Sequence, residues 1–213
     1  MAAVRAISPD TGRRLAYLAA FANILAAASL LFVLRRGLPP ENLRARAAFV
    51  SSHEAVWRLG WLSWNVAAVT LLGLFLALAS RWRNHAPVFC GLAIVVATAG
   101  LAADLSAEAL LAGFTRSTPG NLALVQTEAL LLTGYVGNGL YTAAGILLTI
   151  AGRRELPAGM LALAALVWVA GSWLAAATLV GSSTGEALST GLLMTSFVAW
   201  ATLVGRWFGS LAS

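Results

Sequence analysis

The chain contains no lysine, because all 14 of its basic residues are arginine. A retinal or pyridoxal group bound as a Schiff base needs a lysine amine, and the common phosphate-binding loop also uses a lysine. The absence of lysine therefore excludes these three kinds of site.

Cysteine and histidine are also scarce. The single cysteine, Cys90, cannot form an internal disulfide, and we expect it to be a buried small hydrophobic residue. The two histidines, His53 and His85, open and follow the same apolar segment at opposite ends, which excludes a haem held between facing histidines. A structural zinc site would need more histidine or cysteine ligands. We expect no metal site, and the sequence identifies no cofactor.

Charged residues make up only 10% of the chain, whereas hydrophobic residues make up 60%. This balance is far from that of a soluble domain and is typical of helices in lipid. Six apolar segments are long enough to cross a bilayer, at about 15–34, 56–80, 87–111, 122–150, 158–180 and 187–207. The first is too long for a signal-peptide core and no cleavage site follows it, so we expect it to be retained. The sequence predicts an all-α fold, a six-transmembrane-helix bundle forming a single integral membrane domain over residues 1–213.

Local signals refine this six-helix bundle. Leu43, Ala47 and Val50 share one helical face, with Arg44 and Arg46 away from it, which predicts a short amphipathic interfacial helix between the first two spans. Ser51 and Glu54 have the spacing of a capping box, which predicts that the second spanning helix starts there. Three glycines in six residues, at 134, 137 and 139, predict a weak point in the fourth span.

The net charge of +6 is explained by membrane topology rather than by nucleic-acid binding, because the arginines cluster at the ends of the apolar segments. An even number of spans places both termini on one side. We predict that this side is the cytoplasm and that the membrane is the cell inner (plasma) membrane. The first connection opposes this assignment, because five arginines lie between Arg35 and Arg58.

Two carboxylates interrupt the third span. Asp104 and Glu108 are four residues apart, so a helix places both on one face, one turn from each other. A charge in the hydrocarbon core costs several kcal/mol, so the pair calls for a functional or structural reason. Glu128 is the other acid without a local role, and it lies near the start of the adjacent fourth span. We expect these three acids to converge in the outer half of the membrane, at the level of His53 and Arg58.

This constellation favours small-molecule binding or transport at an acidic and aromatic cavity. The ligand would be small and either apolar or cationic, and the lipid bilayer is the other expected partner; an oligomer is compatible with the sequence. The candidate residues for ligand binding or proton relay are Asp104, Glu108, Glu128, His53, Arg58, Asn138, Trp64, Trp168, Trp173 and Tyr135.

Two other interpretations stay open. The first is an intramembrane acid–base enzyme that uses Asp104, Glu108 and Glu128 with His53. The second is a structural or partner subunit without a site, in which Arg58 or Arg116 neutralises the acids. A polar path from the acids toward Asn138 and Asn23 would favour transport.

One short stretch carries a resemblance to known proteins. Ser52-His53-Glu54, followed by Trp57-Arg58-Leu59-Gly60, places a polar cap and an arginine at the start of a long apolar helix. In this stretch and in its overall hydropathy the chain resembles small bacterial six-span membrane proteins of a domain-of-unknown-function family. The resemblance implies a six-helix bundle in a bacterial inner membrane, and it implies no activity and no catalytic residue.

Overall fold

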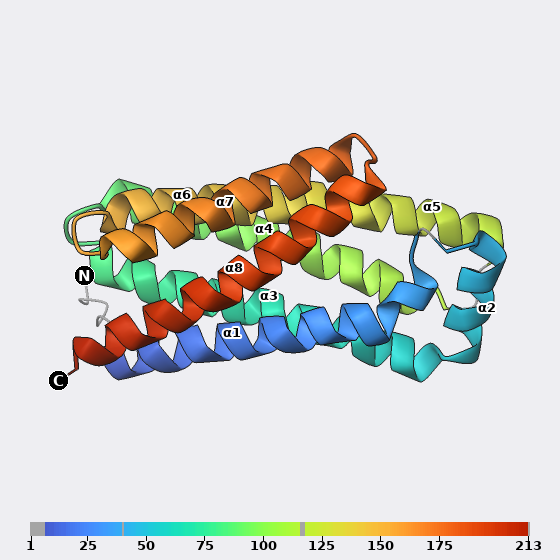
Figure 1. The fold of residues 1–213 in the computed structure, drawn as a ribbon, viewed down its shortest axis with the longest axis horizontal. Helices are drawn as coiled ribbons and strands as arrows, with labels where there is room; N and C mark the ends of the chain where they lie inside the picture. The colour runs from blue at the N-terminus through green and yellow to red at the C-terminus, as the bar shows by residue number, and fades with distance from the viewer. Residues whose placement is uncertain (1–6, 40, 116–117, 213) are drawn as a thin grey trace.

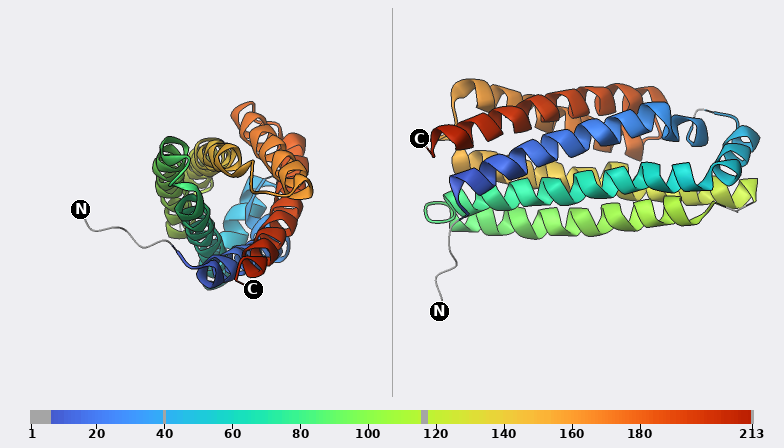
Figure 2. Two further views of the ribbon diagram at one scale, coloured as in Figure 1. Left: turned by 90° about the vertical axis from the view of Figure 1, so that its left-hand side faces the viewer. Right: turned by 90° about the horizontal axis from the view of Figure 1, so that it is seen from below.

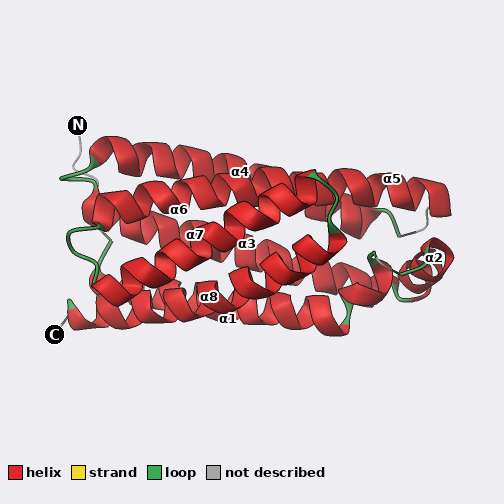
Figure 3. Cartoon of the chain, turned by 45° about the horizontal axis from the view of Figure 1, so that its top comes forward, coloured by secondary structure: helices red, strands yellow, loops and turns green. Residues whose placement is uncertain are grey.

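The structure, a computed structural model, describes residues 7–39, 41–115 and 118–212. Within these ranges it contains helices and no strand, as Figure 3 shows. Six helices are long and apolar enough to cross a membrane, which confirms the predicted fold class. They are α1 (Pro9–Phe32), α3 (Glu54–Trp82), α4 (Pro87–Gly113), the continuous α5–η2–α6 segment (Pro119–Gly152), α7 (Ala158–Leu179) and α8 (Ser183–Ser210).

The six helices form a closed ring of antiparallel neighbours. Around the ring the order is α1, α3, α4, α6 (Asn138–Gly152), α7 and α8, and α8 packs again on α1. Figure 2 shows this ring along the bundle axis. The start of α1 and the end of α8 lie at one end, called here the terminal end (Figure 1). The opposite end carries the short helix α2 (Leu43–Ser52) and is called here the α2 end.

Two hydrophobic clusters fill most of the interior. The larger one, toward the terminal end, is built around Phe75, Trp82, Trp168, Trp200 and Phe208. The smaller one, at the α2 end, contains Leu34, Leu38, Val50, Trp57, Trp61, Ala107, Leu111 and Ala129. Large apolar side chains such as Leu18, Phe21 and Val95 are exposed along the outside of the ring. An apolar outer surface of this extent is what a lipid-facing bundle presents.

Several helix starts differ from the predicted spans, and two of these differences concern the capping residues. α1 begins at Pro9, six residues before the predicted start, because the Ser8 side chain accepts a hydrogen bond from the Thr11 amide and caps the helix. The predicted capping box at Ser51 and Glu54 does not form. Ser51 belongs to the last turn of α2, and α3 follows His53, whose side chain makes no capping hydrogen bond.

The amphipathic helix α2 forms as predicted, but one of its arginines points the other way. Val50 is buried in the cluster at the α2 end. Arg46, expected on the outer face, instead reaches inward, and its Nη1 donates to Gln126 Oε1 over 2.8 Å. The predicted weak point in the fourth span is confirmed, because residues Leu131–Gly137 (η2) form a π-helical segment between α5 (Pro119–Leu130) and α6 (Asn138–Gly152).

Candidate functional site

The inner face of α4 carries the two carboxylates singled out in the sequence. Its buried residues recur with helical spacing and include Ala93, Ala97, Gly100, Asp104, Ala107, Glu108 and Leu111. Asp104 is 7% exposed and Glu108 is 0% exposed. The helical period that hides the alanines therefore also turns both acids into the interior.

Asp104 faces the π-helical segment η2. The Thr133 hydroxyl donates a hydrogen bond to Asp104 Oδ1. The backbones approach closely here, because a Cβ added at Gly137 would lie 3.4 Å from the Gly100 carbonyl oxygen and 3.5 Å from the Asp104 Cβ. Tyr141, buried in α6, lies near enough to interact electrostatically with both acids. Segments of this kind occur frequently at functional sites.

Glu108 has no partner in the part of the chain that the structure describes. Both of its carboxylate oxygens are buried and accept no hydrogen bond. Its nearest charged interaction is with the like charge of Asp104. A buried carboxylate in this position needs a proton or a cation, because burial of an unpaired charge is strongly unfavourable.

Arg58 does not neutralise this pair. Its Nη2 lies 2.5 Å from Glu54 Oε1, one turn away on α3, and its Nε donates to the Ala112 carbonyl over 3.3 Å. Arg116, the other arginine proposed for this role, lies outside the described residues. No described arginine forms an ion pair with Asp104 or Glu108.

His53 and Glu128 lie on the surface, whereas Asp104 and Glu108 lie in the interior. His53 is exposed at the α2–α3 junction, where its ring stacks on Phe49 with 4.7 Å between centroids. Glu128 is exposed on α5. The structure therefore brings together only two of the three predicted acids, and without the histidine.

The four aromatic candidates lie in three different environments. Trp64 is half-buried between the small cluster Ala22–Ala26–Ala67 and the cluster at the α2 end, and its indole nitrogen has no hydrogen-bond partner. Trp168 lies in the terminal-end core and donates to Thr149 Oγ1 over 2.9 Å. Trp173 and Tyr135 are each 42% exposed on the outer surface. Of these four, Trp64 alone combines a place in the α2 half of the bundle with an unpartnered indole N–H.

The two asparagine side chains considered for a polar path bond to backbone instead. Asn138 Nδ2 donates to the Gly171 carbonyl over 2.7 Å and so ties α6 to α7. Asn23 Nδ2 donates within its own helix to the Ala19 carbonyl. The contacts therefore extend from the acid pair to Thr133 and Tyr141 rather than to these amides.

Sequence reasoning missed a second buried polar group, at the α2 end. Gln126 is 1% exposed, and its Nε2 donates to the Gly37 carbonyl over 2.6 Å while its Oε1 accepts from Arg46. Burial lowers the pKa of the Arg46 guanidinium. Gln126 is two residues from Glu128. Glu128 was predicted to be the buried residue of this stretch because it is an acid, whereas the buried residue is Gln126. Thr133 and Tyr141 were missed because isolated hydroxyls in an apolar segment carry no sequence signal.

Two surface clefts lie away from the acid pair. One lies at the α2 end of α1, and the other is an apolar groove between α1 and α3. In the described residues, no group of three or more histidine, cysteine, aspartate or glutamate side chains could hold a metal ion. Neither of these clefts is the acidic and aromatic cavity predicted from the sequence, since the buried Asp104 and Glu108 line neither of them.

Comparison of the chain with protein-family models, curated proteins and solved structures finds no match. The conclusion on identity therefore rests on the molecule alone. The chain has six apolar helices long enough to cross a membrane, and their outer surface carries exposed apolar side chains. These features are those of a multi-pass membrane protein.

Proposed function

We propose that this membrane protein binds and transports a small cation, with Asp104 and Glu108 as the binding carboxylates. The observation that carries the proposal is the environment of Glu108, which is fully buried with both carboxylate oxygens unpartnered. Intramembrane acids that face a bundle interior commonly mark ion or proton pathways. A proton or a cationic ligand supplies the positive charge that the surrounding residues do not.

The neighbours of the pair suit a ligand that is both cationic and partly apolar. Trp64 presents an aromatic ring in the same half of the bundle, and Tyr141 lies beside the acids. Aromatic faces attract organic cations, more strongly where water is excluded. We infer that a small organic cation competes with a proton for Asp104 and Glu108.

The π-helical segment gives the pair an element that can move. η2 lacks the regular hydrogen bonding of an α-helix, and its Thr133 bonds directly to Asp104. A shift of η2 between π and α geometry would change the partner of Asp104 and the access to Glu108. Such a two-state element is what alternating access to a buried site requires.

We also propose that both termini are cytoplasmic and that the membrane is the inner (plasma) membrane of a bacterial cell. The resemblance of the stretch from Ser52 to Gly60 to small bacterial six-span proteins supports this location, as does the arginine distribution. The acid pair would then lie in the half of the bundle nearer the outer side.

An intramembrane acid–base enzyme is a second proposal, with less support. Thr133 and Tyr141 give Asp104 proton-bearing neighbours, which favours proton exchange. However, His53 and Glu128, which were to complete the catalytic set, are exposed. A structural subunit that neither transports nor catalyses would show no ion flux, no binding of the cationic probe and no product in the following test.

The test is proton and cation movement into sealed liposomes that contain the purified protein. A pH-sensitive dye inside the liposomes reports proton flux under an imposed membrane potential, and tetraethylammonium, which crosses a lipid bilayer poorly by itself, serves as the cationic probe. We expect Glu108→Gln and Asp104→Asn to lose flux. We expect tetraethylammonium binding by the wild-type protein to weaken as pH falls, since protons compete for the same carboxylates.

Glu128→Gln is the matched control, because it removes an exposed acid from the adjacent helix. Its flux should equal that of the wild-type protein. If all four proteins conduct equally, or if none conducts and none binds the probe, the transport proposal is wrong. A change in the products formed from a membrane substrate, without flux, would instead support the enzyme.

A further inference from the structure

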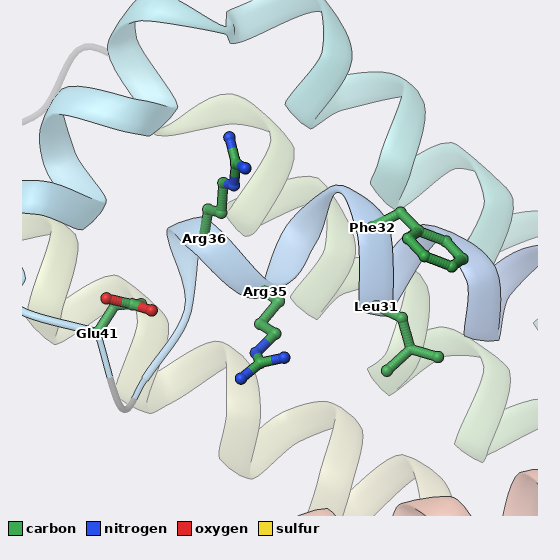
Figure 4. Close-up of a pocket in the computed structure, with 5 residues that line it drawn as sticks. All are labelled: Leu31, Phe32, Arg35, Arg36 and Glu41. Atoms are coloured by element: carbon green, nitrogen blue, oxygen red, sulfur yellow. The ribbon is translucent and has the colours of Figure 1, made fainter.

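The cleft at the α2 end of α1 has a volume of about 310 Å³ and is lined by Leu31, Phe32, Arg35, Arg36 and Glu41 (Figure 4). It lies where α1 ends and the 3₁₀ helix η1 (Leu34–Gly37) turns the chain toward α2. This is the point at which an apolar helix gives way to charged residues. The cleft is separate from the acid pair, and nothing in the proposed transport depends on it.

One wall of the cleft is apolar and faces outward. Leu31 is 61% exposed and Phe32 is 81% exposed, in the last turn of α1. Large apolar side chains with this exposure, at the end of a spanning helix, mark the edge of the hydrocarbon layer. A lipid chain is the natural neighbour of this wall.

The second wall is basic. Arg35 and Arg36 are exposed, and no described carboxylate forms an ion pair with either, whereas Arg13, Arg58 and Arg81 each have an acidic partner. In Figure 4 the side chains of Arg35 and Leu31 extend to the same side of the chain, whereas the side chain of Arg36 extends to the opposite side. A guanidinium at this level meets the phosphate layer, and its planar fork matches phosphate oxygens.

Glu41 adds a carboxylate to the same cleft, across from Arg35. A carboxylate repels a simple anion but accepts hydrogen bonds from an ammonium group. The ethanolamine headgroup carries a phosphate and a primary ammonium, so its two charges match the two kinds of side chain. Choline has no N–H to donate, and glycerol has no positive charge.

We propose that this cleft binds the headgroup of phosphatidylethanolamine, with the phosphate on Arg35, the ammonium on Glu41, and an acyl chain along Leu31 and Phe32. The proposal accounts for part of the arginine excess in the first connection. Arg46 is bound to Gln126 and Arg58 to Glu54, so neither acts as a free surface charge. Arg35 then binds lipid phosphate rather than setting the topology.

The experiment is native mass spectrometry of the purified full-length protein in detergent with equal amounts of phosphatidylethanolamine, phosphatidylglycerol and phosphatidylcholine. We expect the wild-type protein to retain phosphatidylethanolamine over the other two lipids. The double variant Arg35→Gln/Arg36→Gln should retain about tenfold less of it, as expected for loss of charge-assisted hydrogen bonds. Glu41→Gln should lose the preference for phosphatidylethanolamine over phosphatidylglycerol while it still binds both.

Arg44→Gln is the matched control, because Arg44 is exposed at the same end of the bundle but does not line the cleft. It should retain lipid as the wild-type protein does, and a monodisperse size-exclusion peak checks that each variant is folded. The proposal is overturned by equal retention of the three lipids, by an unchanged double variant, or by an equal loss in Arg44→Gln. Displacement of the lipid by an equal concentration of inorganic phosphate would identify a simple anion site, which also overturns it.

Discussion

A hydrogen bond from the Thr133 hydroxyl to Asp104 links the acid pair to a second helix segment. It joins α4 to the π-helical segment and gives one of the two carboxylates a donor. Glu108, one turn away, has none. Two chemically similar acids on one helix face thus differ in how well the fold satisfies them, and the proposed function rests on this difference because Glu108 is the acid without a donor.

Replacing Thr133 by valine should destabilise the protein. The change keeps the side-chain shape but leaves the buried Asp104 without its donor, at a cost of about 1–3 kcal/mol. The free energy of unfolding, measured by denaturant titration in detergent micelles, should fall by this amount. Thr133→Ser, which keeps the hydroxyl, should restore most of the loss.

Thr127→Val is the control for this measurement. Thr127 is exposed one helix segment earlier and bonds only to the Ala123 carbonyl of its own helix. Its replacement should change the unfolding free energy by less than about 0.5 kcal/mol. Equal losses in the two variants would contradict a specific role for Thr133.

At the scale of elements, the α2 end is closed by side chains from three distant parts of the chain. Gln126 of α5 holds Gly37 of η1 and Arg46 of α2, and the Trp57 indole of α3 donates to the Leu111 carbonyl of α4 over 2.6 Å. A Cβ at Gly37 would overlap the Trp57 ring. These contacts hold η1 and α2 across the end of the ring.

Gln126→Leu should loosen this end of the molecule. The substitution fills the same space but leaves the Gly37 carbonyl and the Arg46 guanidinium without their partner, which costs about 1–3 kcal/mol. Hydrogen–deuterium exchange should show faster exchange across residues 34–52, while α7 and α8 stay unchanged.

Asn121→Leu provides the comparison, because Asn121 lies exposed on the same helix. Its exchange in residues 34–52 should match that of the wild-type protein. Unchanged exchange in Gln126→Leu would mean that α2 is held by its apolar contacts alone.

At the scale of the whole molecule, the ring places charged and apolar surfaces in bands. The exposed apolar side chains run along the outside of the spanning helices, and the start of α1 and the end of α8 share one end with the α3–α4 and α6–α7 turns (Figure 1). At that end Arg81 and Glu155 join two of the turns, with 2.9 Å between Arg81 Nη2 and Glu155 Oε2. This arrangement makes the orientation measurable with a few surface positions.

Single cysteines should report the orientation. Cys90 is buried, so labelling of the natural cysteine by a membrane-impermeant maleimide should be low. On intact cells, Ser182→Cys at the α7–α8 turn should react, whereas Asn84→Cys at the α3–α4 turn should react only after the membrane is opened. Both positions are exposed. The reverse pattern would place the termini outside.

The sequence by itself determined the six spans and the interruption in the fourth. In lipid a chain must satisfy its backbone hydrogen bonds within each helix, so the length and hydropathy of each segment decide that it spans. The glycines at 134, 137 and 139 weaken one helix in the same local way. The helix boundaries near Ser8 and Ser51 were not predicted correctly, because the residue that caps a helix is decided by one or two side-chain hydrogen bonds.

Only the tertiary structure decided which polar residues are buried. Glu108 and Glu128 look alike in sequence, yet one is fully enclosed and the other is exposed, because the rotation of each helix is set by its packing in the ring. Arg46 and Gln126 meet across 80 positions of sequence, a contact that no local pattern encodes. The same packing separates His53 from the acids, and it selects Asp104 with Glu108 as the pair on which the proposed function depends.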